Sequence, residues 1–413
     1  MEKENLLKEI TGSYLNSENF NGYLLYDLEQ DKQKIIELVQ KGKIDINFGD
    51  KHLNFYIKAF EPDDIQTQIN KINDIGLKNC CAYPSRNHLK EKVYYGKFKN
   101  KPFTRKIALG EPTLNFAVFD LSVLEIYRND PRYSYSTNEI SGQIVISDEY
   151  YKSLEVKPSD KILLQTFGFC YEKEKLNRAV AVFYCYLSKL SEEHQKIWQG
   201  KLLSGDYFLH PDYARTSSGN WAEKESIFTA FIEELHVINE FSKLMGRSTL
   251  FKEDYKNNKP KEFGFLIRPT HKEFNSFVHL LDKMISENIN KDFFMNEIEC
   301  DFEEERKDGK LVVTPKGSIT LLKEWIDKKI TLSDPEPKNK MIENFRKIRK
   351  IRQPQAHIVN DDIFDQKYFK EQRKLIVEAY NSIRTLRLML ANHPKTKSYE
   401  VPDWLYKGNI WTH

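Results

Sequence analysis

Two side chains with complementary chemistry stand close together towards the C-terminal end of the sequence. Arg352 carries a permanent positive charge, and His357, with four residues between them, titrates near neutral pH. Pro354 lies between the two and cannot continue a helix, because its ring blocks the preceding turn. The chain is therefore predicted to turn there. A guanidinium and an imidazole at one helix end can bind a phosphate group and transfer a proton beside it.

The segments on both sides of this turn have apolar residues at helical spacing, which predicts a helix over 339–351 and a second over 365–390. The Pro-Glu-Pro run at 335–337 separates the first of them from the preceding chain. From Lys340 to His393 there are twelve Lys or Arg and six Asp or Glu, a surplus that exceeds the net charge of +3 for the whole chain. A locally basic helix pair is typical of a site for a polyanionic ligand, although a solvated helix face has the same composition.

The bare pattern of an arginine followed by a histidine is common. The chain holds fifteen Arg and ten His, so about one such spacing is expected by chance. Two occur, the second being Arg387 and His393, which lie within and just after the last predicted helix. Context distinguishes the first pair, because it lies at a helix end in the centre of the basic segment. The alternative is that Arg352 and His357 only cap a helix C-terminus, where cations are favourable.

The residues Arg349, Arg352, Ala356 and His357, followed by the long helix from Asp365, resemble the R-x(4–6)-H motif of the HEPN (higher eukaryotes and prokaryotes nucleotide-binding) family. The resemblance covers about residues 263–393. It implies a small α-helical bundle in which Arg and His form a metal-independent endoribonuclease site, usually assembled from two such domains across a dimer. By this resemblance Arg352 and His357 are the catalytic residues.

The resemblance also implies a biological setting and a reaction. The predicted protein is a cytoplasmic endoribonuclease of a defence, abortive-infection or toxin type, cutting RNA, tRNA included, to leave 2′,3′-cyclic phosphate and 5′-hydroxyl ends. It would act as a homodimer without metal or other cofactor, and respond to a trigger protein of phage or host origin. Arg349, Lys350 and Gln353 are the predicted substrate-binding residues.

Three alternatives remain open at this stage. Gln353 occupies a position where active family members often have Asn, Asp or His, and glutamine cannot titrate, which favours a HEPN-like module that binds RNA or nucleotide without cutting it. The second is a structural or adaptor protein whose basic face is only solvated. The third is a metal-dependent hydrolase, for which the sequence offers Glu233, Glu234 and His236 on one predicted helix and the acidic run at 301–305. Surface positions are the commoner interpretation of both groups.

The rest of the chain is predicted to be α+β. Residues 1–190 are expected to form a β-rich mixed domain with a sensor or regulatory role, 191–262 a helical connector, and 263–413 the helical domain with an aromatic tail. The β-prone runs, bounded by turn residues, are 52–60, 93–98, 114–119, 143–146, 162–169 and 179–187. The further helical segments are 192–203, 222–245, 271–289 and 318–330, with a β-like excursion at 301–314.

Composition limits the classes of protein to which the chain can belong. Forty per cent hydrophobic and 13% aromatic content is typical of a folded globular protein. No run of eighteen apolar residues is present, and Met1 to Ile10 lack the apolar core of a signal peptide. The five cysteines show no metal-ligand spacing, and free thiols in a reducing cytoplasm are expected, with the adjacent Cys80 and Cys81 buried or partly buried.

Overall fold

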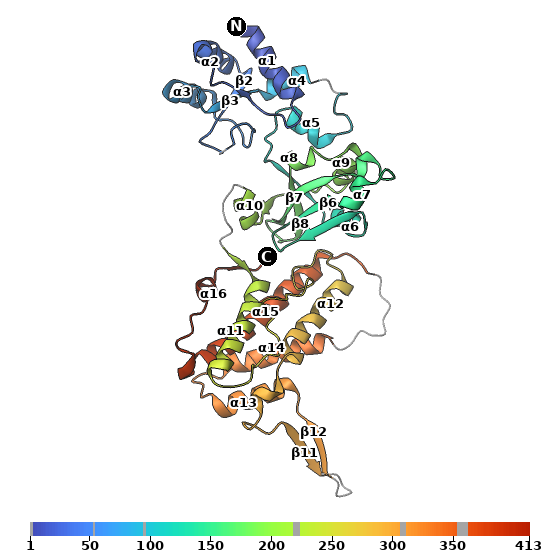
Figure 1. Ribbon diagram of the computed structural model, residues 1–413, viewed down its shortest axis with the longest axis vertical. Coiled ribbons are helices and arrows are strands. Elements are labelled where there is room, and N and C mark those ends of the chain that lie inside the picture. Colours follow the sequence, from blue (N-terminus) through green and yellow to red (C-terminus); the bar gives the residue numbers. More distant parts are fainter. Residues whose placement is uncertain (1–2, 53, 94–95, 218–223, 306–310, 353–361) are drawn as a thin grey trace. The chain divides into compact units, whose positions relative to one another are not determined.

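The computed structural model describes residues 3–52, 54–93, 96–217, 224–305, 311–352 and 362–413. It is an α+β structure, as predicted. The chain forms two compact units, Met1–Asn220 and Trp221–His413 (Figure 1). The segment 191–262, expected to be a helical connector, is divided between them. Its strand β9 (Tyr207–Leu209) pairs with β7 of the first unit, whereas its long helix α11 (Ile227–Leu244) belongs to the second.

The first unit contains a small antiparallel sheet in the order β1-β3-β2. Helices α1 (Lys3–Asn16), α2 (Lys32–Gln40) and α3 (Ile65–Ile75) supply aliphatic side chains to its core. The central strand was not predicted, because every residue of it is buried and its sequence, C-C-A-Y-P, therefore shows no alternation. The strands are β1 (Tyr23–Leu24), β2 (Ile44–Phe48) and β3 (Cys80–Pro84).

A six-stranded antiparallel sheet forms the rest of the first unit, in the order β4-β8-β7-β6-β5 with β9 paired to β7 (Figure 1). The predicted hairpin of the last two β-prone runs is confirmed, although the second strand ends at Phe183 and continues as α8 (Tyr184–Leu187). The predicted strands at 52–60 and 93–98 are wrong, because their described residues form turns, bends and irregular chain. The strands are β4 (Phe116–Phe119), β5 (Tyr133–Thr137), β6 (Ser141–Ile146), β7 (Leu163–Glu172) and β8 (Arg178–Phe183).

Short helices complete this unit. Two of them begin at side-chain caps: Ser85 accepts a hydrogen bond from the amide of His88, and Ser191 from that of His194. They are α4 (Arg86–Lys92), α5 (Pro102–Ala108), α6 (Val123–Arg128), α7 (Asp148–Lys152), α9 (Glu192–Gln199), α10 (Pro211–Ser217) and the 3₁₀ turns η1 (Glu29–Asp31) and η2 (Pro158–Asp160).

The second unit is a helical assembly, in which α15 (Gln366–Ala391) packs on α11 and α14, and α14 (Glu336–Arg352) packs on α12 (His271–Asp282) (Figure 1). Each corresponds to a helix predicted from apolar spacing. Their shared core is rich in aromatic rings, with Phe228 in edge contact with Phe263 and Phe265. α13 (Ser318–Lys329) contacts α14 as well. The smaller elements are the π-helical turn η3 (Lys283–Glu287), the 3₁₀ turns η4 (Lys291–Phe294) and η5 (Pro394–Thr396), and α16 (Asp403–Lys407).

The second unit is not purely helical. The β-like excursion is a hairpin of β11 (Asp301–Glu305) and β12 (Leu311–Pro315), which projects from the helices in Figure 1. A short parallel pair joins β10 (Glu225–Ser226) to β13 (Ile410–Trp411), so the two ends of this unit are hydrogen-bonded to each other. In the part of the chain that the structure describes, no helix is long and apolar enough to cross a membrane.

Candidate functional site

Arg352 is the last residue of α14, at the helix end where the sequence placed it. Its Nη1 lies 2.7 Å from Oδ2 of Asp282, the final residue of α12, and it also pairs with the carboxylate of Glu287 at the end of η3. Hydrogen bonds to these carboxylates raise the pKa of Arg352, and the hydrogen bond from Arg352 lowers the pKa of Glu287. The guanidinium therefore joins the end of α14 to the chain that leaves α12.

The two carboxylates differ in their exposure. The side chain of Asp282 is fully buried, whereas that of Glu287 is 46% exposed. Both ion pairs use Nη1 of Arg352, which leaves Nε and Nη2 outside them. A phosphate group could approach that free edge, and it would compete with Glu287 more easily than with Asp282, because Glu287 is solvated and on the surface.

The structure describes three of the five predicted site residues. Arg349, Lys350 and Arg352 all lie in the last turn of α14, and Gln353 and His357 lie outside the described residues. Arg349 and Lys350 are exposed, as expected for phosphate contacts. Arg349 lines a pocket, whereas Lys350 is not among the residues that line it. The structure therefore gives no distance between Arg352 and His357.

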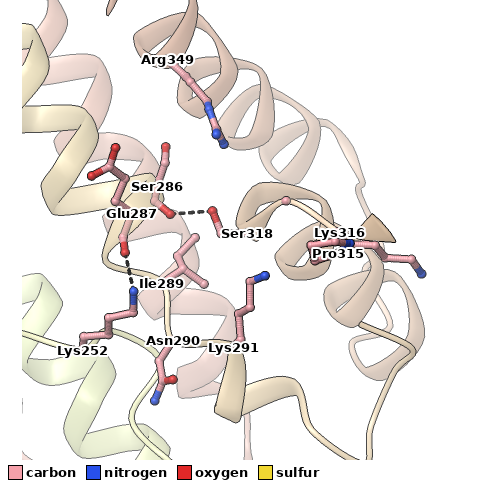
Figure 2. Close-up of a pocket in the computed structure, with 11 residues that line it drawn as sticks. Lys252, Ser286, Glu287, Ile289, Asn290, Lys291, Pro315, Lys316, Ser318 and Arg349 are labelled. Atoms are coloured by element: carbon pink, nitrogen blue, oxygen red, sulfur yellow. Dashed lines mark hydrogen bonds between the residues drawn. The ribbon is translucent and has the colours of Figure 1, made fainter. Parts of the chain in front are cut away.

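The pocket beside Arg349 has a volume of about 580 Å³. Figure 2 shows Arg349 reaching down from α14 and Lys291 reaching up from η4 into this space. Lys252 closes one side, where its Nζ donates a 2.9 Å hydrogen bond to the backbone oxygen of Glu287. The lining residues are Lys252, Ser286, Glu287, Ile289, Asn290, Lys291, Pro315, Lys316, Gly317, Ser318 and Arg349. Because Glu287 also holds Arg352, the pocket and the Arg352 ion pairs are parts of one site.

The first turn of α13 forms another wall of the pocket. Gly317 is the N-cap of this helix and no side chain caps it. The first amide N–H groups of a helix have no intrahelical acceptor and carry a partial positive charge. The Ser318 hydroxyl donates instead to the backbone oxygen of Ser286 at 2.5 Å, which fixes this turn against η3.

Sequence reasoning missed most of this site. Asp282 and Glu287 fall inside the predicted helix at 271–289, but nothing in their spacing relates them to Arg352, seventy and sixty-five residues later. Lys252 lies in an irregular segment and Lys291 begins η4, and neither gives a local signal in a lysine-rich chain. Only the packing of α14 on α12 brings them to one place.

The second arginine–histidine pair is structural. Arg387 is buried and forms a two-point ion pair with the fully buried carboxylate of Glu234, with Nη2 at 3.2 Å from Oε1. Burial raises the pKa of Glu234 despite that partner. His393 accepts a hydrogen bond from the amide of Lys395 and caps η5. The ion pair between Arg387 and Glu234 joins α15 to α11.

The other candidate sites do not assemble. Glu233 pairs with Lys256, Glu234 with Arg387, and His236 with Asp254, so the three side chains turn to three separate partners. Among the described residues, no group of three or more His, Cys, Asp or Glu side chains lies close enough to hold a metal ion. The acidic run at 301–305 forms strand β11.

The cysteines are free, as expected. Cys80 and Cys81 are buried in β3, and burial raises the pKa of both thiols to about 12. A thiol with so high a pKa is almost entirely protonated at neutral pH and is a poor nucleophile. Successive residues of a strand point to opposite faces of the sheet, so Cys80 and Cys81, although adjacent in the sequence, lie on different sides of β3.

Comparison with known proteins gives no relative: no family model, no curated protein and no solved structure matches this chain.

Proposed function

We propose that the second unit binds RNA and cuts it without a metal ion, using Arg352 and His357. The observation that carries the proposal is the last turn of α14, where Arg352 and Arg349 lie beside a pocket that also holds Lys252 and Lys291. Cations clustered at one helix end, within a segment of positive surplus, are the electrostatic arrangement that a phosphate backbone requires. The proposed family remains the HEPN-like one, on the residues of the R-x(4–6)-H motif.

The reaction follows from the residue types. The ribose 2′-oxygen attacks the adjacent phosphorus, a new P–O bond forms, and the bond from phosphorus to the 5′-oxygen breaks. His357 takes the 2′-hydroxyl proton or supplies a proton to the leaving 5′-oxygen, for which a pKa near neutrality is suited. Arg352 stabilises the negative charge that collects on the phosphoryl oxygens. The products are a 2′,3′-cyclic phosphate and a 5′-hydroxyl.

A complete site needs a second acid or base, and each chain offers only Arg352 and His357 for this role, because Arg387 of the other pair is buried against Glu234. We therefore propose a homodimer in which two second units form a composite site. The setting we propose is the bacterial cytoplasm, with cellular RNA or tRNA as substrate, the first unit as sensor, and a phage or host protein as trigger. Such a nuclease arrests its own cell, which is the behaviour of abortive-infection and toxin systems.

A second candidate function is supported by a separate observation. The charge of Arg352 is already matched by two carboxylates, one of them fully buried. Such a guanidinium is suited to holding helices together, and it would leave Arg349 and the pocket lysines as an RNA-binding surface that does not cut. Gln353, which cannot titrate, favours this candidate as well.

The deciding experiment is cleavage of total RNA and tRNA by purified protein in EDTA. The parent is compared with His357→Ala, Arg352→Lys and the matched control His393→Ala, which removes the histidine of the structural pair. Cutting by the parent and the control, with cyclic-phosphate ends, and loss of cutting in the other two variants is the expected result. Cutting that survives His357→Ala would refute the proposed site.

A silent parent leads to a second measurement. If the enzyme needs a trigger, its expression should arrest growth, and His357→Ala should relieve that arrest while His393→Ala should not. RNA binding by a parent that neither cuts nor arrests growth, retained in His357→Ala, would establish the second candidate.

A further inference from the structure

We infer that the pocket between α14, η4 and the first turn of α13 is a binding site for a phosphate group. The proposed function bears on this inference only by naming RNA as one source of the phosphate. The site itself is argued from its own side chains, which the sequence analysis did not identify, apart from Arg349.

The first support is a group of positively charged side chains at the pocket that have no carboxylate partner among the described residues. Arg349 and Lys291 come from different elements, both point into the pocket, and neither forms an ion pair with any described residue. Lys252 donates to a neutral backbone oxygen, so its charge is not compensated either. Three uncompensated cations around one cavity repel one another, and a bound anion removes that repulsion.

A fourth cation of the lining, Lys316, serves as a comparison, because its side chain has a structural role. Lys316 lines the pocket through its backbone, while its side chain runs away from it in Figure 2. Its Nζ lies 2.8 Å from the carboxylate of Glu324 and 5.1 Å from the centre of the Phe302 ring. Lys316 is therefore engaged in packing the hairpin against α13. Among the described residues, Lys291 and Arg349 have no comparable partner.

Two further features supply donors suited to oxyanions. The uncapped first turn of α13, a helix of 12 residues, presents amide N–H groups and the positive end of the helix dipole. Ser286 lines the same pocket and is only 2% exposed, and its hydroxyl has no hydrogen-bond partner among the described residues.

The lining indicates a phosphate rather than a base. None of the described lining residues is aromatic, so the pocket offers no ring on which a base could stack. Its one carboxylate, Glu287, is paired with Arg352 and does not neutralise the lysines. A group with several charged oxygens and no ring is the ligand that fits.

The test is calorimetric titration of the full-length protein with inorganic pyrophosphate. The variant is Lys291→Gln with Arg349→Gln. The matched control is Arg346→Gln, an exposed arginine one turn earlier on α14 that does not line the pocket. Because each removed group makes a charge-assisted contact, affinity should fall by about tenfold or more in the double variant. The control should bind within about twofold of the parent, because it loses only a long-range charge interaction that salt screens. A parent that does not bind pyrophosphate, or a folded double variant that binds it as the parent does, would overturn the inference.

A second titration identifies the source of the phosphate. The probe is a 2′-O-methyl RNA oligomer, which cannot attack its own phosphate and so remains uncut. If the double variant weakens binding of both probes and pyrophosphate displaces the oligomer, the pocket holds a strand phosphate. If only pyrophosphate binding is weakened, the pocket holds a free phosphate or nucleotide. The inference and the proposed nuclease fail separately, because binding of pyrophosphate requires neither His357 nor cleavage, whereas the cleavage assay compares a variant at His357, outside the pocket lining described here.

Discussion

Replacing Arg352 by alanine should destabilise the contact between α12 and α14, whatever it does to activity. Asp282 is fully buried, and its Oδ1 has no hydrogen-bond partner among the described residues, so Arg352 is its main source of compensation. Removing one partner of a buried ion pair costs about 3–5 kcal/mol. Because the Arg352 side chain is 31% exposed, water screens part of that interaction, and we expect a loss of about 2–3 kcal/mol.

The assay is hydrogen exchange of the full-length protein, read at the amides of α12 and α14. Arg352→Ala should speed exchange there, and adding Asp282→Asn should recover most of the loss, because a neutral amide is cheaper to bury than an unpaired carboxylate. Arg346→Ala, on the same helix but exposed, should change the local free energy by less than about 0.5 kcal/mol. If Arg352→Ala behaves like Arg346→Ala, or if Asp282→Asn gives no recovery, the argument for a buried ion pair is wrong.

Three further predictions concern the rest of the chain. Burial lowers the pKa of His194 below its ordinary value of 6.5. The unfolded chain therefore binds more protons in acid, and the stability of the first unit should fall as the pH drops through about 6.5. In thermal unfolding at pH 5–8, His194→Gln should make the stability of the first unit less dependent on pH. An unchanged slope of stability against pH would contradict the role of His194. Arg387→Ala should destabilise the second unit by about 3–5 kcal/mol in urea, because it leaves Glu234 buried without its partner. His393→Ala should cost far less, and equal losses would contradict the assignment. Cys80 and Cys81, with thiol pKa values of about 12, should react with a disulfide reagent only on unfolding, whereas the half-buried Cys300 should react in the native protein. Rapid labelling of Cys80 would show that β3 opens.

The parts of the fold that the sequence predicts are those with a long periodic signal. α11 and α15 repeat apolar residues over several turns, so their existence and approximate limits are readable. β3 is not readable, because a strand buried on both faces loses its alternation. The aromatic run at 52–60 misleads for the opposite reason. Its rings have high β propensity, yet its described backbone forms no strand ladder. The Tyr56 carbonyl accepts from the amide of Gly22 and the Lys58 carbonyl from that of Thr113, while the Asn54 carboxamide accepts from the amide of Tyr56.

The same distinction holds for the site. The position of Arg352 at a helix end is a local property, and Pro354 was enough to predict it. The partners of Arg352 are a tertiary property, since Asp282 and Glu287 reach it only through the packing of α12 on α14. No spacing rule links residues that far apart in one sequence, and without related sequences there is no covariation to reveal them.

The short parallel pair of β10 and β13 has a consequence for how the protein can be engineered. Glu225 pairs with Ile410 and Ser226 with Trp411, whose ring stacks on Phe265 at 5.8 Å between centroids. Residues 225–226 and 410–411 of the second unit therefore lie side by side. This arrangement allows a domain to be transplanted or circularly permuted without stretching its chain. Joining residues 224 and 413 by a short linker and opening a surface loop should leave its helices in register. An affinity tag fused directly after His413, by contrast, would be attached beside the strand that closes the unit.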